Sequence, residues 1–119
     1  MRLAVVGSRS LSRVDITGYI PDNVTEIVSG GALGIDACAK DYAEGHGMML
    51  TEYLPQYARF GRSAPLKRNR DIVVYAEAVL IFWDGCSRGT AQVISLCRTM
   101  NKPHTVYVYD AKADAFRAL

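Results

Sequence analysis

Short apolar runs alternate with segments of helical periodicity along most of this chain, and that alternation narrows the fold more than any other feature. The apolar runs cover residues 3–6, 26–29, 48–53, 78–83 and 105–109. Helical patterns cover residues 34–45, 63–75 and 90–100, with a shorter one at 14–20. Because neighbouring parallel strands are joined by crossover helices, the order predicts an α/β fold. We expect a doubly wound parallel sheet of about five strands with helices on both faces.

The remaining segments are expected to be less regular. Residues 54–62, which contain Pro55 and Gly61, should form a loop, and residues 111–119 a weak helix or a frayed tail. No internal repeat, linker or low-complexity segment divides the chain. A length of 119 residues suits one domain, so we expect residues 1–119 to form a single unit. A closed barrel is excluded because it needs eight strand–helix units.

Composition and charge exclude several classes of protein. No run approaches the roughly 18 apolar residues that span a bilayer, and the first apolar run is too short for a signal peptide. The three cysteines are an odd number without a Cys-x-x-Cys pair, which indicates reduced thiols. The net charge is only +2, so global charge demands no nucleic-acid partner. We therefore expect a cytoplasmic protein without membrane contact.

Glycines gather where the apolar runs end. Six of the ten lie in three turns, at residues 7–9, 29–36 and 84–90. The carboxyl ends of parallel strands meet at one edge of a sheet, and ligands bind there where the strand order reverses. Glycine lets backbone N–H groups approach a ligand, and the start of a following helix favours an anion. Tight turns use Gly and Ser without any ligand too, but three such turns on one edge favour a phosphate-bearing ligand.

A stretch without acidic residues lies between Glu52 and Asp71. It carries the basic residues Arg59, Arg62, Lys67, Arg68 and Arg70. One interpretation is a solvated surface. The other is an anion site for a phosphate or a phosphodiester, which arginine binds through charge-assisted hydrogen bonds. Position along the sequence leaves both interpretations open.

Several established motifs are missing. The chain lacks the P-loop pattern GxxxxGK[ST], the dinucleotide pattern GxGxxG and the GxSxG of serine hydrolases. Gly31 and Gly34, followed by Glu52, imitate the dinucleotide pattern only loosely. His46 and His104 have no partners at ligand spacing, and the cysteines are scattered. We therefore expect neither a metal site nor a cofactor.

Four segments taken together resemble a known family. They are Val6-Gly7-Ser8-Arg9, residues 29–36 (SGGALGID), Arg68-Asn69 and residues 82–90 (FWDGCSRGT). In this order they resemble the SLOG superfamily, in its small stand-alone YspA-like branch. Its relatives include the DNA-processing protein DprA, also called Smf, and the Lonely Guy phosphoribohydrolases. The resemblance covers nearly the whole chain.

The resemblance implies a Rossmann-like fold with strand order 3-2-1-4-5. It also implies a nucleotide-type small molecule as ligand, such as ADP-ribose or AMP. Pairing into a homodimer is implied by the resemblance alone. The ligand-binding positions that it implies are Gly7, Ser8, Arg9, Ser29, Gly30, Gly31, Gly34, Asp36, Arg68, Asn69, Asp84, Gly85, Ser87, Gly89 and Thr90.

One departure from the family bears on catalysis. Lonely Guy enzymes carry the motif PGGxGTxxE, whose glutamate serves cleavage of an N-glycosidic bond. Aligning its Gly-Thr pair with Gly89 and Thr90 places Val93 at that glutamate. Cleavage develops positive charge on the sugar, which a carboxylate normally stabilises. Catalytic residues therefore stay unassigned. The carboxylates that could act from another direction are Asp36, Glu52 and Asp84.

Three functions follow as hypotheses. The leading one is a cytoplasmic domain that binds or senses a nucleotide or a nucleotide derivative. The first alternative is an enzyme that hydrolyses a phosphoribosyl or ADP-ribosyl N-glycosidic bond. The second is a DprA-like binder of single-stranded DNA. Tyr57 and Phe60 among the basic residues support that nucleic-acid alternative, because bases stack on aromatic rings, whereas the small net charge opposes it.

Overall fold

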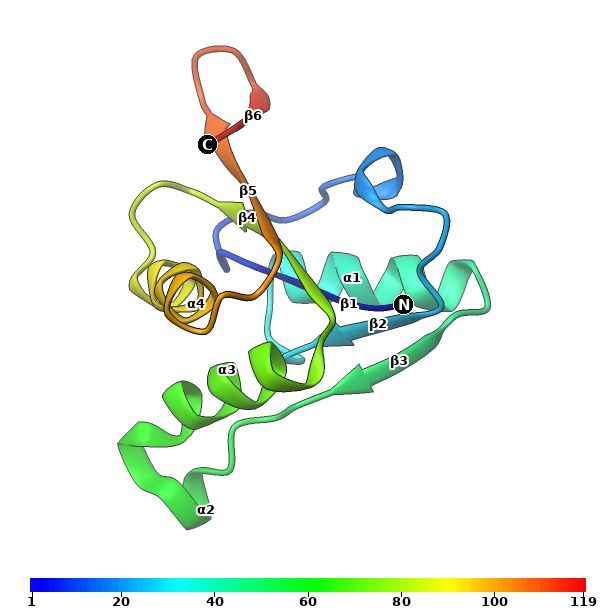
Figure 1. Ribbon diagram of the computed structural model, residues 1–119. Coiled ribbons are helices and arrows are strands. Elements are labelled where there is room, and N and C mark those ends of the chain that lie inside the picture. Colours follow the sequence, from blue (N-terminus) through cyan, green and yellow to red (C-terminus); the bar gives the residue numbers. More distant parts are fainter.

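Six strands form one sheet through the middle of the molecule (Figure 1). The computed structural model describes all of residues 1–119. The strands are β1 (Arg2–Gly7), β2 (Glu26–Ser29), β3 (Met49–Glu52), β4 (Ala78–Trp83), β5 (His104–Asp110) and β6 (Ala115–Ala118). Their order in the sheet is β3-β2-β1-β4-β5-β6. The first five are parallel, which confirms the predicted α/β class and the order 3-2-1-4-5.

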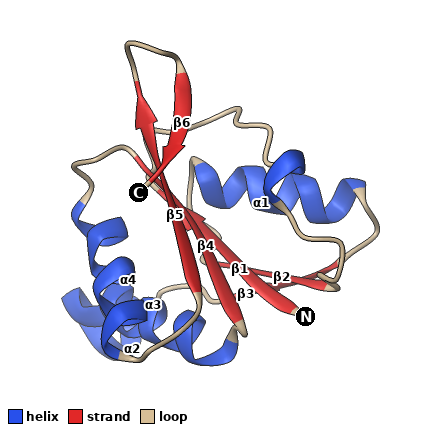
Figure 2. Cartoon of the chain, turned by 45° about the horizontal axis from the view of Figure 1, so that its top comes forward, coloured by secondary structure: helices blue, strands red, loops and turns tan.

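Helices cover both faces of the sheet, as predicted. The helical segments are α1 (Ile35–Gly45), α2 (Tyr57–Phe60), α3 (Ala64–Tyr75) and α4 (Arg88–Thr99), with short 3-10 turns η1 (Thr17–Tyr19) and η2 (Gly61–Ser63). Figure 2 shows α1 on one face, and α3 and α4 together on the other. No helix has the length and apolar character needed to cross a membrane.

Two hydrophobic cores lie on the two faces because strand side chains alternate between them. Ala4 and Val6 of β1 face the core under α3 and α4. Leu3 and Val5 face the core under α1, which also takes in Ile16 from the connection between β1 and β2. Burial on both faces explains why the strands read as continuous apolar runs rather than as alternating ones.

The predicted helix or tail at residues 111–119 is wrong. The chain turns back after Asp110 and adds β6, which pairs antiparallel with β5. The ring of Phe116 packs on Phe82, with ring centroids 5.2 Å apart, and on Tyr109 at 5.5 Å. The ring of Tyr19 belongs to the same cluster, 6.4 Å from that of Phe116. These long-range aromatic contacts decide the conformation of a segment whose local pattern is weak.

Two shorter segments also differ from expectation. The predicted helix at residues 14–20 is reduced to the three residues of η1. The predicted loop at 54–62 contains the single turn of α2, followed by η2. Gly61, which follows α2 and begins η2, has a φ of 56°, a conformation that glycine adopts without the steric cost other residues meet. Together α2 and η2 lead directly into α3.

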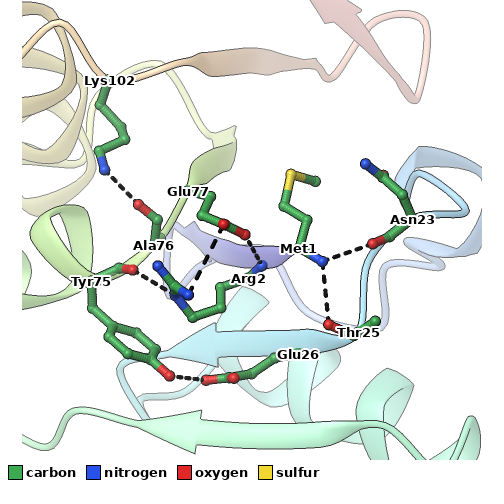
Figure 3. Close-up of polar contacts among 9 residues, drawn as sticks. All are labelled: Met1, Arg2, Asn23, Thr25, Glu26, Tyr75, Ala76, Glu77 and Lys102. Carbon is green, nitrogen blue, oxygen red and sulfur yellow. Dashed lines mark hydrogen bonds and ion pairs between the residues drawn. The ribbon is translucent and has the colours of Figure 1, made fainter.

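The edge of the sheet where the parallel strands begin is closed by hydrogen bonds (Figure 3). Arg2 donates from Nε to the carbonyl oxygen of Tyr75 at 2.9 Å, and its backbone N–H donates to Glu77 at 2.6 Å. Glu26, whose carboxylate lies at this edge, is only 8% exposed. It accepts hydrogen bonds from the hydroxyls of Tyr75 at 2.6 Å and Thr51 at 2.7 Å. We call the edge of the sheet where the parallel strands begin the amino edge.

Candidate functional site

A cavity of about 270 Å³ lies at the opposite edge, where β1 and β4 end side by side. We call this the carboxyl edge. After β1 the chain packs Leu11 and Ile16 into the core under α1, whereas after β4 it enters α4 on the other face. The strand order therefore reverses between β1 and β4. Crevices at such a reversal are where open α/β sheets bind their ligands.

Nine of the fifteen sequence-predicted positions line this cavity. They are Gly7, Arg9, Gly30, Asp36, Arg68, Asn69, Ser87, Gly89 and Thr90. They come from three strand ends and three helices, α1, α3 and α4. The fold thus brings together residues that are up to 83 positions apart in the sequence. That they bind a ligand remains a prediction.

The other six predicted positions do not line the cavity. They are Ser8, Ser29, Gly31, Gly34, Asp84 and Gly85. Ser8 is buried, and its Oγ accepts the backbone N–H of Asp84 at 3.0 Å. Asp84 in turn accepts the backbone N–H groups of Cys86 at 3.0 Å and Ser87 at 2.8 Å. Ser8 and Asp84 thus stabilise the turn between β4 and α4.

Asp84 is fully engaged in that turn. Its Oδ2 also accepts a hydrogen bond from the hydroxyl of Ser10 at 2.7 Å. Burial by itself would raise the pKa of the Asp84 carboxyl, but the hydrogen bonds from Ser10, Cys86 and Ser87 together hold it well below its usual range. A permanently ionised carboxylate whose two oxygens both accept hydrogen bonds suits the stabilisation of the turn better than contact with an anion.

The start of α4 faces the cavity through Ser87, Gly89 and Thr90. Ser87 caps the helix, since its Oγ accepts the backbone N–H of Thr90 at 3.5 Å. The Thr90 hydroxyl lies 3.1 Å from that of Ser87 and 3.3 Å from that of Ser8. A twelve-residue helix directs its partial positive charge at this point. The arrangement favours an anion in the cavity.

Two arginines line the cavity in different ways. Arg9 follows β1, is exposed, and makes no side-chain hydrogen bond or ion pair. Arg68 on α3 is half-buried and donates from Nη1 to the carbonyl oxygen of Gly30 at 2.7 Å. Its Nε donates to Oδ1 of Asn69 at 2.9 Å. Burial lowers the pKa of Arg68, while the nearby carboxylate of Asp36 opposes that shift.

Asp36 in the first turn of α1 is the single carboxyl group among the 14 lining residues. It is 7% exposed, and its Oδ2 accepts the backbone N–H of Ala32 at 3.1 Å. Burial raises the pKa of Asp36 more than that hydrogen bond and the charge of Arg68 lower it. A partly buried carboxyl of this kind can accept hydrogen bonds from sugar hydroxyls.

Two glycines permit close approach at the cavity. A Cβ on Gly30 would lie 2.5 Å from Nη1 of Arg68 and 2.9 Å from Oδ2 of Asp36. Gly34 has a φ of 74°, and a Cβ there would lie 2.6 Å from the carbonyl oxygens of Ser8 and Arg9. Side chains at either position would displace the groups that line the site.

Five lining residues were not foreseen from the sequence. They are the mostly apolar Val6, Ala32, Pro65, Ile72 and Val93. Val93 is the position aligned with the missing glutamate, and it does face the cavity. Ile72 and Val93 could have been found as positions on α3 and α4 that follow the polar lining residues by three, because residues three apart share a helix face.

In comparisons with known proteins, no family model, no curated protein and no solved structure matches the chain. No group of three or more His, Cys, Asp or Glu side chains is placed to hold a metal ion.

Proposed function

We propose that this protein binds a phosphate-bearing nucleotide in the cavity at the carboxyl edge. One observation supports the proposal most: the unpartnered guanidinium of Arg9 lines the same cavity as the capped start of α4. Oriented backbone N–H groups and a free arginine are the two devices that proteins use most to hold phosphate. Arg68 adds a second positive charge to the same lining.

The size of the cavity favours a small ligand. At about 270 Å³ it lies just below the usual range of about 300–1,000 Å³ for small-molecule sites. It suits a phosphoribosyl group, as in AMP, better than a ligand with two nucleoside halves. In this arrangement the phosphate lies against the start of α4, and Asp36 accepts hydrogen bonds from the ribose.

Binding is favoured over N-glycosidic hydrolysis. Asp84 and Glu52 do not line the cavity, which leaves Asp36 as the sole carboxyl group that could stabilise a developing positive charge. Burial raises the pKa of Asp36, because it disfavours the charged form that such catalysis needs. Valine at position 93 supplies no charge. The protein is therefore proposed to bind or sense its ligand.

The single-stranded DNA alternative depends on different residues. Tyr57 is 56% exposed on α2, outside the cavity, and the guanidinium of Arg59 lies 4.9 Å from the ring centre of Phe60. An exposed aromatic and basic surface of this kind is compatible with stacked bases. This alternative predicts a steep decrease of affinity with salt, because several phosphates release counterions together.

Calorimetric titration with AMP and adenosine tests the proposal. We expect AMP to bind and adenosine to bind at least tenfold more weakly, because a charge-assisted phosphate contact contributes about 1.5–3 kcal/mol. Equal affinities would contradict the phosphate site. A titration with oligothymidylate at two salt concentrations separates the DNA alternative, since a mononucleotide in a cavity depends on salt only weakly.

A further inference from the structure

Arg68, Asn69 and Gln92 form a chain of side-chain hydrogen bonds that begins at the cavity lining and leads away from it. Nε of Arg68 donates to Oδ1 of Asn69 at 2.9 Å. Nδ2 of Asn69 donates to Oε1 of Gln92 at 2.7 Å. Gln92 is half-buried on α4 but does not line the cavity. The chain therefore connects α3 to α4 and ends on a residue outside the site.

The direction of these hydrogen bonds is fixed by chemistry. A guanidinium can only donate, so the amide of Asn69 must present its oxygen to Arg68. Its nitrogen then points toward α4 and needs an acceptor, which only the oxygen end of Gln92 supplies there. Each amide is thus held in one of its two orientations. Gln92 is the residue that sets the orientation of Asn69 from the far end.

The same bonds determine which part of Arg68 is left for a ligand. Nη1 is bound by the carbonyl oxygen of Gly30 at 2.7 Å and lies 3.5 Å from that of Tyr53. Nε is bound by Asn69. Nη2 makes no hydrogen bond, and no buried side-chain nitrogen lacks a partner, so Nη2 is accessible. Arg68 can therefore meet an anion with one nitrogen rather than with its bidentate fork.

We infer that Gln92 is a positioning residue for the phosphate site: it orients Asn69, which holds the Arg68 guanidinium so that Nη2 presents its two N–H groups to the ligand. The inference rests on the proposed function for its ligand. The orientation of the Arg68 guanidinium can be measured without any ligand. Preorganised donors of this kind raise affinity because less side-chain entropy is lost on binding.

Hydrogen exchange of the Arg68 Nε–H, followed by NMR, tests the geometry directly. Gln92→Met keeps the length of the side chain and removes the acceptor, and Gln92→Ala is a second such variant. We expect the Nε–H of Arg68 to exchange about fivefold faster in both, as the loss of one hydrogen bond implies. Gln92→Glu retains an acceptor and should keep the slow exchange. Ser95→Ala, exposed on the same helix, is the matched control.

A double-mutant cycle on AMP affinity tests whether Gln92 positions Arg68 for the ligand. Gln92→Met should weaken AMP binding about fivefold in the natural protein and have no effect when Arg68→Ala is already present, because Gln92 acts through Arg68. Equal losses in both backgrounds, or unchanged Nε–H exchange in Gln92→Met, would overturn the inference. If AMP does not bind at all, the proposed function fails, and the exchange measurement still decides whether Gln92 orients Arg68.

Discussion

The two ends of β1 carry arginines in opposite circumstances. Arg2 at the amino edge donates to the carbonyl oxygen of Tyr75, lies 4.0 Å from the carboxylate of Glu77, and sits 4.9 Å from the centre of the Tyr75 ring. Arg9 at the carboxyl edge has no such partner. The same residue type is thus tied down at one end of the strand and left free at the other.

The buried carboxylates of the two edges differ in the same way. Glu26 accepts hydrogen bonds from two hydroxyls, whereas Asp36 accepts one backbone N–H. Buried polar groups normally find all their partners within the protein. Both edges follow this rule, but the hydrogen bonds of Glu26 join β2 to β3 and α3, whereas that of Asp36 stays within one turn and leaves the carboxyl group in the cavity lining. We therefore expect substitutions at the amino edge to change stability, and substitutions at the carboxyl edge to change binding.

The largest expected effect is that of Glu26→Ala. It removes the acceptor of two hydroxyl groups, and hydrogen bonds to a charged group contribute about 1.5–3 kcal/mol each. We expect the free energy of unfolding, measured by urea denaturation, to fall by about 3 kcal/mol. AMP affinity of the folded protein should stay unchanged. A loss of affinity without a loss of stability would reverse the comparison between the edges.

Arg9→Ala should have the opposite signature. AMP affinity is expected to fall about ten- to a hundredfold, because a charge-assisted contact with phosphate is lost. The free energy of unfolding should not change, since the side chain has no partner in the free protein. Arg70→Ala is the matched control, exposed on α3 and away from the cavity lining. Comparable losses in both variants would indicate a diffuse charge effect.

A pH series on Asp36→Asn sharpens the comparison further. The pKa of Asp36 is raised in the folded protein, so the folded state holds the proton more tightly than the unfolded chain. Asp36 therefore contributes increasing stability as the pH falls from its folded pKa to its unfolded value. We expect the free energy of unfolding of Asp36→Asn, relative to that of the natural protein, to be highest at neutral pH and to decrease as the pH approaches 4. A difference independent of pH would contradict the raised pKa.

The smallest expected effect is that of Gly45→Ala. Gly45 ends α1 near the amino edge, and a Cβ there would meet nothing within 4 Å. Alanine restricts the unfolded chain, so the free energy of unfolding should rise by about 0.4–1 kcal/mol. The affinity for AMP should stay unchanged. A decrease in the melting temperature would show that the end of α1 is more crowded than its geometry indicates.

The parallel sheet can be predicted from the sequence because the pattern that specifies it is local. Each apolar run and each following helix is visible in a short window, and parallel pairing follows from their alternation. β6 is different, because Phe116 packs on rings of η1 and β4 that lie far away in the sequence, as well as on Tyr109 of the preceding β5. No local pattern reports such contacts. The weak local signal of residues 111–119 therefore indicates only a helix or a tail.

The site shows a similar division. Sequence reasoning finds polar residues at strand ends, but it cannot separate those that face a cavity from those that support a turn. Asp84 and Asp36 look alike in this respect, and only their partners distinguish them. The sequence places Arg68 among the ligand-binding positions but does not show that two of its nitrogens are already engaged within the protein. Hydrogen-bond geometry between helices supplies what sequence position does not.

The central place of β1 also has a kinetic consequence. β1 must pair with β4, and contacts across that boundary, such as the one from Arg2 to Glu77, join residues 75 positions apart. Closing so long a loop costs entropy before any contact compensates for it. The cavity lies at the same junction, so it exists only once this closure is complete. A ligand bound in the cavity should slow the separation of β1 from β4. It should therefore also slow the unfolding of the chain.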